Sequence, residues 1–416
     1  MERLWNKNYI KVWTANFMIN FSFMIVMPLL PLYLSETFQA DKHVIGLVLS
    51  GYTVTALLTR PLSGYLVDNF KRKNVLLISY FLFFIFFAGY IFAASLLLFA
   101  IVRTFHGMPM GTVTVANSTV AIDVLPSSRR AEGIGYYGLS NNLATAIAPT
   151  VGLFVYQYLH SYDMVFILAL VSSGTGLYIN STVELKERLL QKTKCKLSLD
   201  RFILLKGWSL GTTLACLAFS YGVISTYLAI YGKEELHMTS GTGLFFAVLC
   251  CGLMTSRLVG ARTLRRGMIV FNCSLGALIS VCGYFLFAAL HNSWGYYGAA
   301  LIIGLGNGHM FPAMQNMFIC LAPASQRGTA NSTLLTSWDI GIGLGVMFGG
   351  ICVDWGGYNS AFWLAWIVNI VGVLFFFAFA KAHYERNKQK YQAFPSCVGS
   401  PQMSALTHDI KSNNSP

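Results

Sequence analysis

The stretch RPLSGYLVDNFKRKN, from Arg60 to Asn74, places one acid and four cations between two long apolar segments. A related stretch, SRLVGARTLRRG from Ser256 to Gly267, keeps a glycine and several cations but lacks the aspartate. The surrounding chain is strongly apolar, with 55% of its 416 residues hydrophobic and 11% charged. A soluble protein carries about 25% charged residues. This composition suits a lipid bilayer, in which one helical span needs about 20 apolar residues.

The sequence predicts an all-α membrane protein with twelve transmembrane helices. The expected spans cover residues 11–34, 45–66, 74–94, 96–122, 132–159, 163–181, 202–232, 241–262, 268–290, 294–321, 329–353 and 361–382. The first span is too long for a signal peptide and has no small-residue cleavage site. The residues after 382 become polar, and we expect a flexible tail there.

The positions of the cations predict the orientation of the chain. With the N-terminus inside, only Lys42 and Lys233 fall in the opposite loops, while most other cations lie on one side. That bias is typical of cytoplasmic loops. We therefore expect both termini in the cytoplasm, a location in the plasma (inner) membrane, and no nucleic-acid partner despite the net charge of +13.

The chain also contains an internal repeat. A shift of 197 residues superposes Arg60 on Arg257, Gly107 on Gly304 and Gly111 on Gly308 without a gap. This constant offset predicts two six-helix pseudo-repeats, residues 1–183 and 202–382, joined by a central cytoplasmic loop at 184–201 and followed by a cytoplasmic tail at 383–416. Two such halves are able to rock about a site near the middle of the membrane.

The opening stretch resembles the signature between the second and third spans of the major facilitator superfamily, G-x-L-x-D-x-x-G-R-K/R. The matching residues are Gly64, Leu66, Asp68, Arg72 and Lys73, whereas Lys71 replaces the second glycine. The segments DVLPSSRRAEGIGYYG and QRGTANSTLLTSWDIGIGLG resemble a bacterial branch close to the sugar and drug efflux carriers. The fifth span holds Ala144, Ala148, Pro149 and Gly152, which resemble the antiporter signature, and in the family this motif accompanies export.

The resemblance implies that the second span packs against the eleventh, which is expected to begin near Gly328. A carboxylate at Asp68 would then meet the positive N-terminus of that helix and latch one half to the other. Arg72 would pair with Asp123, and Gly64 is expected to allow close packing. The alternative is that these charges only set topology, which explains the lysines but not an acid in a basic loop.

Several ionisable residues lie inside the predicted spans, where a charge is costly and is a functional candidate by default. Arg60 and Asp339 have matching depths, and we expect either a structural ion pair or a proton carrier at Asp339. Arg103 matches an arginine of the fourth span that the family links to proton coupling. His106 and His309 fall at matching depths in helices that line the cavity in this family, and suit proton exchange; each could instead be an ordinary hydrogen-bonded histidine.

The remaining polar and aromatic residues of the spans are predicted to line a substrate cavity. They are Asn16, Asn20, Asn117, Asn142, Tyr221, Tyr227, Asn307, Gln315, Asn316 and Trp338. No phosphate-binding loop, metalloprotease motif or nucleophile elbow is present, so we expect neither an enzyme nor a metal or cofactor site. The sequence predicts a monomeric secondary transporter that exports a small organic or drug-like solute by proton antiport. The alternatives are uptake or facilitated diffusion of a sugar-like metabolite, and a membrane receptor.

Overall fold

The computed structural model describes residues 3–40, 42–185, 202–237 and 241–388, and it is helical almost throughout. The central loop at 186–201 and the tail at 389–416 lie outside the described residues. In chain order the helices are α1 (Lys7–Val26), α2 (Leu30–Phe38), α3 (Lys42–Asn69), α4 (Arg72–Ile91), α5 (Leu96–Val124), η1 (Ser127–Arg129), α6 (Arg130–Leu159), α7 (Tyr162–Ser181), η3 (Leu205–Gly207), α8 (Trp208–Glu234), α9 (Gly241–Arg265), α10 (Ile269–Ala289), α11 (Ser293–Leu321), η4 (Ala324–Gln326), α12 (Arg327–Phe375), the π-helical η5 (Phe376–Ala380) and α13 (Lys381–Asn387).

The helices have the lengths that membrane spans require. Among the described residues, seven helices are long and apolar enough to cross a bilayer, or eight if the bent pair α1–α2 counts as one span. Three more, α3, α6 and α11, have 28, 30 and 29 residues but are more polar. At about 1.5 Å per residue, each exceeds the roughly 30 Å of a hydrocarbon core. With α12 counted as two limbs, these helices give the twelve spans that the sequence predicts.

Two of the predicted spans differ from the structure at their ends. The first span is not one helix, because α1 ends at Val26 and α2 begins at Leu30, with a bend of 40°. Pro28 lies within this break and Pro31 in the first turn of α2, and proline supplies no N–H to a helical ladder. The twelfth span runs on through η5 into α13, so the chain stays helical to Asn387, beyond the predicted end at 382.

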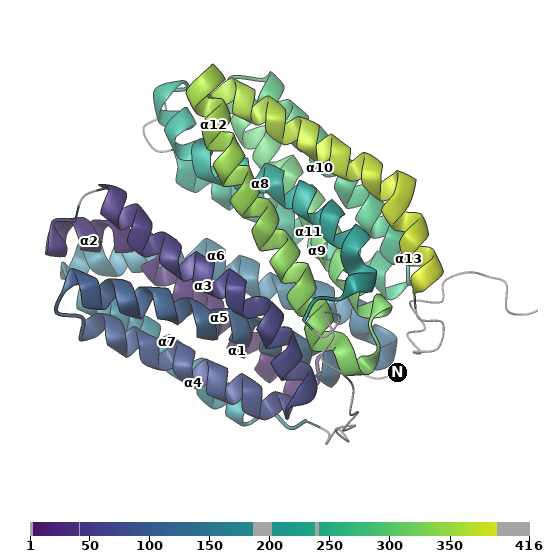
Figure 1. Cartoon of the computed structure of the whole chain (residues 1–416), viewed down its shortest axis with the longest axis horizontal. Coiled ribbons are helices and arrows are strands. Elements are labelled where there is room, and N and C mark those ends of the chain that lie inside the picture. Colours follow the sequence, from purple (N-terminus) through teal and green to yellow (C-terminus); the bar gives the residue numbers. More distant parts are fainter. Residues whose placement is uncertain (1–2, 41, 186–201, 238–240, 389–416) are drawn as a thin grey trace, which may run out of the picture.

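The eleventh and twelfth spans meet at a single glycine. α12 consists of two helical limbs between Arg327 and Phe375 that meet at Gly357, where φ is 75° and ψ is 178°. Glycine adopts this conformation without the steric cost that a side chain imposes. The Ser360 hydroxyl donates to the carbonyl of Cys352 at 2.7 Å and helps to hold the break. The two limbs therefore fold back on each other (Figure 1).

The internal repeat appears as a repeated backbone contact. A Cβ atom placed on Gly107 would lie 2.1 Å from the carbonyl oxygen of Tyr52, and one on Gly304 would lie 2.2 Å from that of Leu249. Both the glycines and the carbonyls differ by 197 residues. Small residues allow such close approach of helices in a membrane. The same crossing therefore joins α3 to α5 in the first half and α9 to α11 in the second.

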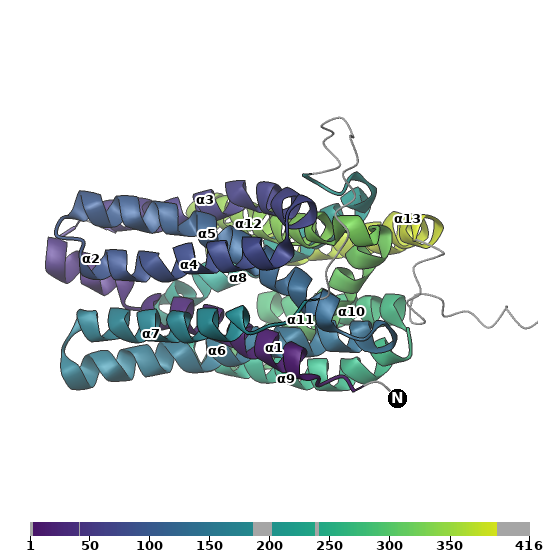
Figure 2. The same cartoon turned by 90° about the horizontal axis from the view of Figure 1, so that it is seen from below.

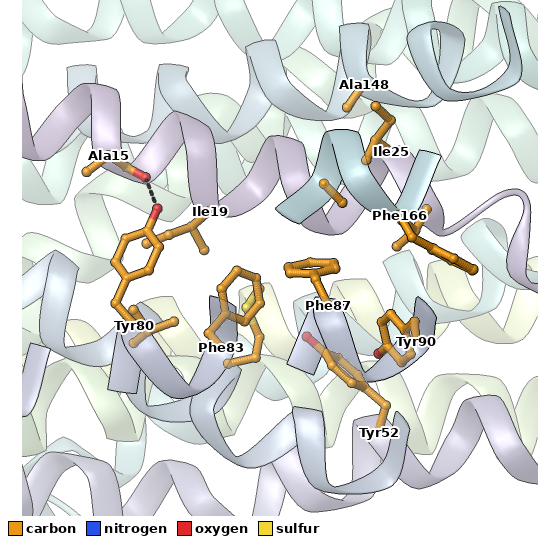
Figure 3. Close-up of a cluster of buried hydrophobic side chains, with 14 of the residues drawn as sticks. Ala15, Ile19, Ile25, Tyr52, Tyr80, Phe83, Phe87, Tyr90, Ala148 and Phe166 are labelled. Carbon is orange, nitrogen blue, oxygen red and sulfur yellow. Dashed lines mark hydrogen bonds between the residues drawn. The ribbon is translucent and has the colours of Figure 1, made fainter. Parts of the chain in front are cut away.

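The two halves have separate apolar cores at one end and a shared core at the other. In the first half, Tyr80, Phe83, Phe87 and Tyr90 of α4 pack toward α1 and α7, and the Tyr80 hydroxyl donates to the Ala15 carbonyl at 3.2 Å (Figure 3). The buried residues of this core all belong to the first half, and a second core belongs wholly to the second half.

The shared core lies at the end where the basic loops gather. It joins Ile122, Leu125 and Ile134 of the first half to Leu264 and Phe318 of the second. We call this end, which carries Arg72, Arg129, Arg130 and Arg327, the basic end. From it the halves diverge toward the opposite end of the molecule (Figure 1). Figure 2 views the molecule from the side of the first half, with α4 and α7 in front. The contact surface between the halves is called the seam below.

Candidate functional site

Asp68 crosses the seam to the first turn of α12. Its Oδ1 accepts a hydrogen bond from the backbone N–H of Gly328 at 2.9 Å, and its Oδ2 accepts from the backbone N–H of Thr329 at 2.7 Å. The hydroxyl of Thr329 adds a third bond at 2.9 Å. An N-terminal turn has unpaired N–H groups and a partial positive charge, so a carboxylate satisfies both needs.

The charge network extends from Asp68 across the basic end. Arg72 donates to Asp68 at 3.2 Å and forms a second ion pair with Asp123. Arg72 also donates to the carbonyl of Ala324 at 3.2 Å, on the other side of the seam. Arg327 pairs with the other oxygen of Asp123 at 3.0 Å. Arg327 was not predicted as a site residue, because the sequence shows it only as one cation among many.

Gly64 provides the space that this contact needs. A Cβ atom at Gly64 would lie 2.8 Å from the Cβ of Ser332 and 2.9 Å from the Cα of Thr329. Real Cβ contacts this short require the opposing backbone to shift. The sequence therefore brings α3 and α12 together by a glycine, and Asp68 lies one turn further along the same face of α3. We call Gly64, Asp68, Arg72 and Asp123 the latch.

Arg60 and Asp339 meet across the same two helices, deeper in the membrane. Nε of Arg60 lies 2.7 Å from Oδ2 of Asp339, and the two side chains are 13% and 20% exposed. The pair lies eight residues, or about 12 Å along α3, from Asp68. The ion pair expected from depth matching is thus present in this conformation, while its part in proton movement is a separate question.

Exchanging the two charges should test the pair directly. Arg60→Asp or Asp339→Arg alone leaves two like charges facing each other, and we expect transport to fall about tenfold or more. The double exchange restores opposite charges and should recover transport to within about threefold of the parent protein, since contacting residues couple strongly. The measurement is exchange of labelled solute in proteoliposomes. A double variant no better than the worse single variant would contradict the pairing.

Arg103 lies inside the first half rather than at the seam. It is 1% exposed, and its guanidinium lies 4.1 Å from the centre of the Tyr52 ring. One of its nitrogens donates to the Tyr90 hydroxyl at 3.1 Å, and another contacts the sulfur of Met27 at 3.2 Å. No described carboxylate lies within ion-pair distance of it. Its charge is therefore stabilised by an aromatic face and two neutral acceptors, the Tyr90 hydroxyl and the Met27 sulfur.

The two histidines are also internal, and each is hydrogen-bonded within its own half of the chain. His106 is fully buried against Phe83, Phe86 and Phe87, and its Nδ1 lies 2.7 Å from the Tyr90 hydroxyl. His309 is buried in the second half, with Nδ1 2.9 Å from Oδ1 of Asn272 on α10. Matching sequence depth placed them correctly along their helices but did not reveal which face each occupies.

Arg103→Lys should reveal how much the contacts with Tyr52 and Tyr90 depend on a guanidinium. A lysine has no planar guanidinium that could stack on Tyr52 and at the same time donate to Tyr90. We expect a loss of about 1–2 kcal/mol in stability and about a tenfold loss of gradient-driven transport. Thermal unfolding in detergent and flux in proteoliposomes measure the two. Arg262→Lys, at an exposed position of α9, is the matched control, and equal behaviour of both variants would contradict the role of the guanidinium.

Three of the four predicted cavity asparagines of the first half, Asn16, Asn20 and Asn117, belong to one hydrogen-bonded network. The Tyr137 hydroxyl donates to Asn16 at 2.6 Å, and Asn117 donates to that hydroxyl at 2.8 Å. Asn20 donates to Asn141 at 2.9 Å. Asn16 and Asn117 are buried, whereas Asn20 and Asn141 are partly exposed. Tyr137 and Asn141 were not predicted, although Asn141 directly precedes the predicted Asn142 on α6.

Four of the six predicted residues of the second half form two groups. Trp338 lies between Tyr221 and Phe311, with ring centres 5.7 and 5.3 Å away, and gives a partly exposed aromatic surface. Gln315 and Asn316 instead lie at the seam near the basic end, where Asn316 contacts the Ala131 carbonyl at 3.4 Å.

Two residues of the same prediction belong to neither group. The Tyr227 hydroxyl donates to the Val346 carbonyl at 2.8 Å, which ties α8 to the first limb of α12. Asn307 is buried on α11. Their sequence positions gave no indication that their side chains are used in packing rather than exposed to a cavity.

The motif of the fifth span packs α6 against α1. Ala144 and Ala148 are fully buried, and a Cβ atom at Gly152 would lie 2.2 Å from the Ile25 carbonyl oxygen. Pro149 lies within α6 without ending it. Small residues here allow the two helices to touch backbone to backbone.

Outside the network at the basic end, few charged groups stand close together. Arg129, in the loop before α6, pairs with Glu132 at 2.9 Å, and this hydrogen-bonded carboxylate raises the pKa of the guanidinium. Within the part of the chain that the structure describes, no group of three or more His, Cys, Asp or Glu residues could hold a metal ion.

Comparison with known proteins gives the family context of this geometry. Residues 12–319 and 274–408 match the family model described as Major Facilitator Superfamily. The chain is 21% identical over 366 residues to the MFS-type transporter YhhS of Escherichia coli (strain K12), covering 85% of this chain and 87% of that protein. It is 22% identical over 365 residues to the quinolone resistance protein NorA of Staphylococcus aureus (strain MSSA476), covering 84% and 90%.

Solved structures share the arrangement of helices. The fucose:proton symporter FucP of Escherichia coli matches with a TM-score of 0.76 at 15% identity, covering 92% of this chain and 99% of that one. The human organic anion transporter MFSD10 matches with a TM-score of 0.74 at 15% identity, covering 88% and 98%. At these identities the likeness concerns the fold.

Proposed function

The chain belongs to the Major Facilitator Superfamily, and from this premise we propose that this secondary transporter exports a small organic solute in exchange for protons. The observation that carries the proposal is the Arg60–Asp339 ion pair, 2.7 Å long and shared between the two halves. A charge pair that costs several kcal/mol to bury, and that spans the moving surface of the protein, is suited to link proton uptake to that movement.

The mechanism follows from what happens to Asp339 when the halves rock. While the seam is closed, Arg60 compensates the carboxylate. Separation of α3 from α12 would move the cation away from Asp339, and a carboxylate that loses a neighbouring cation takes up a proton more readily. Reclosure with Arg60 would release the proton. Proton binding and the position of the halves would therefore be linked.

The direction of transport rests on the orientation of the basic end. We infer that this end faces the cytoplasm, because cationic loops gather there as the positive-inside bias requires. In the described conformation the latch joins the halves at this end, and the halves diverge toward the other, outward end. FucP, which has the same fold, is described in an outward conformation. The likeness to a quinolone resistance protein and the α6 packing motif support export.

Uptake of a sugar-like metabolite is the second candidate, and one feature favours it. The amides of Asn20 and Asn141 are partly exposed beside the buried network of Asn16 and Asn117. Neutral amides both donate and accept hydrogen bonds, which suits hydroxyl-rich solutes. The same cluster would serve an uncharged polar group of a drug-like compound.

The test is a flux screen with purified protein in proteoliposomes. An imposed pH gradient, acidic on the side that supplies the protons, should drive solute toward that acidic side, and dissipating the gradient should stop net accumulation. Candidate solutes are fluoroquinolones, organic acids and monosaccharides. Solute movement along with protons would overturn export in favour of uptake, and flux that ignores the gradient would overturn coupling altogether.

A further inference from the structure

Arg257 is a buried cation at the seam that has no anion. It lies on α9, is 7% exposed, and faces α6 of the other half. One nitrogen of its guanidinium lies 3.4 Å from the Gly135 carbonyl, and its Nε has no hydrogen-bond partner. A Cβ atom at Gly138 would lie 1.3 Å from Nη1, so the guanidinium occupies the space that a side chain would fill.

The other buried arginines show how unusual this is. Arg60 has Asp339 at 2.7 Å, and Arg103 has the face of Tyr52 at 4.1 Å together with the Tyr90 hydroxyl. Arg257 has one long hydrogen bond to a carbonyl and, within the described chain, neither a carboxylate nor an aromatic face. A buried charge without a partner costs several kcal/mol.

The internal repeat identifies what stands where the missing acid would be. The offset of 197 residues that superposes Arg60 on Arg257 also superposes Asn142 on Asp339, since 339 minus 197 is 142. The same pairs of residues meet in the structure. The Ser332 hydroxyl donates to the Arg60 carbonyl, and the guanidinium of Arg257 donates to the carbonyl of Gly135. Gly135 is the counterpart of Ser332 by the offset of 197 residues. The second seam therefore repeats the first with an amide in place of a carboxylate.

Asn142 presents a second unused donor at the same place. It is 8% exposed, and its amide nitrogen has no hydrogen-bond partner. It lies one turn beyond Gly138 on α6, and helical side chains lean toward the N-terminus, which carries the amide toward Gly138 and the guanidinium. Nε of Arg257 and the amide nitrogen of Asn142 are thus two buried donors without an acceptor, and only the guanidinium is charged.

We propose that Arg257 and Asn142 form a binding position for a carboxylate group of the transported solute. The inference rests on the proposed transport function and names its substrate class, an organic anion. A carboxylate of the solute would pair with Arg257 as Asp339 pairs with Arg60. The guanidinium would donate to both carboxylate oxygens, and the Asn142 amide would be a further donor. When the seam opens, Arg257 leaves Gly135 and its charge becomes available to the solute.

Binding of paired small probes to the purified full-length protein tests this position. The probes are benzoate and hexanoate, each compared with its uncharged amide, and the readout is the shift in thermal unfolding midpoint with probe concentration. The parent protein should bind the acids more tightly than the amides. Arg257→Gln should weaken binding of the acids about tenfold or more, as expected for loss of one member of a desolvated charge pair, and leave amide binding unchanged.

Asn142→Asp gives the sharper test, because it builds the internal ion pair that the repeat predicts. The new carboxylate should occupy Arg257, raise the unfolding midpoint without probe, and abolish preference for the acids. Arg262→Gln, at an exposed position of the same helix, should leave binding unchanged. A parent protein that does not distinguish acids from amides would overturn the proposal, and so would acid binding that survives Asn142→Asp.

The binding readout needs no gradient, so it separates this inference from proton coupling. Acid-selective binding in a protein whose flux ignores a pH gradient would overturn the coupled-export proposal and leave the anion position standing. Gradient-driven flux of a neutral or cationic solute, with no acid-selective binding, would overturn the anion position and leave proton coupling standing.

Discussion

Asp339→Asn is expected to abolish accumulation of solute driven by a pH gradient while leaving exchange of labelled for unlabelled solute in place. Net coupled transport requires a group that binds and releases a proton in each cycle, and the amide of asparagine does neither at physiological pH. Exchange requires only binding and rocking of the halves. Removing one member of a buried pair costs about 2–5 kcal/mol, so exchange should slow but persist.

The paired assay should be run on one preparation of proteoliposomes, first with a gradient and then as counterflow. Asp354→Asn is the matched control, since it neutralises an exposed acid on the same helix and should change neither flux. Gradient-driven flux that persists in Asp339→Asn would place the proton site elsewhere. His106 and His309 are poor substitutes, because both are packed inside their own halves.

The sequence predicts best those features that depend on spacing along the chain. Apolar run lengths gave the spans, and the offset of 197 residues gave the repeat, which the paired contacts of Gly107 and Gly304 reproduce. Asp68 and Asp339 were identifiable because an acid is rare in a basic loop or an apolar helix, and each needs a partner at its own depth.

Features that depend on the rotation of a helix about its axis were harder to predict. His106 and Arg103 have the depth of cavity residues but point into the first half, since phenylalanines and tyrosines of α3 and α4 surround them. In a membrane, lipid-facing and buried residues are both apolar, so the hydrophobic pattern does not reveal which face is inside. Arg257 was aligned by the repeat, yet its missing partner is apparent only from contacts.

Asp68→Asn is expected to open the basic end and to reduce transport about tenfold or more. The carboxylate oxygens accept from both Gly328 N–H and Thr329 N–H at the start of α12, at 2.9 and 2.7 Å. An asparagine keeps one acceptor but turns an NH₂ group toward the other N–H, and it loses the attraction of a negative charge for the helix N-terminus. Arg72 would retain only Asp123 as an anionic partner.

Backbone hydrogen exchange of the segment 327–331 measures the loss of the Asp68 contacts directly, because the N–H groups of Gly328 and Thr329 lie in that segment. In Asp68→Asn these amides should exchange faster while the α11 core remains protected, and surface expression should stay normal. Asp163→Asn removes another acid from a helix first turn, at an exposed position, and should change neither exchange nor transport. Loss of transport without faster exchange would mean that Asp68 acts in another step than closing the seam. Full transport at normal expression would mean that the carboxylate is dispensable and that the remaining contacts of the basic end, Arg327 with Asp123 and the shared apolar core, suffice to close it.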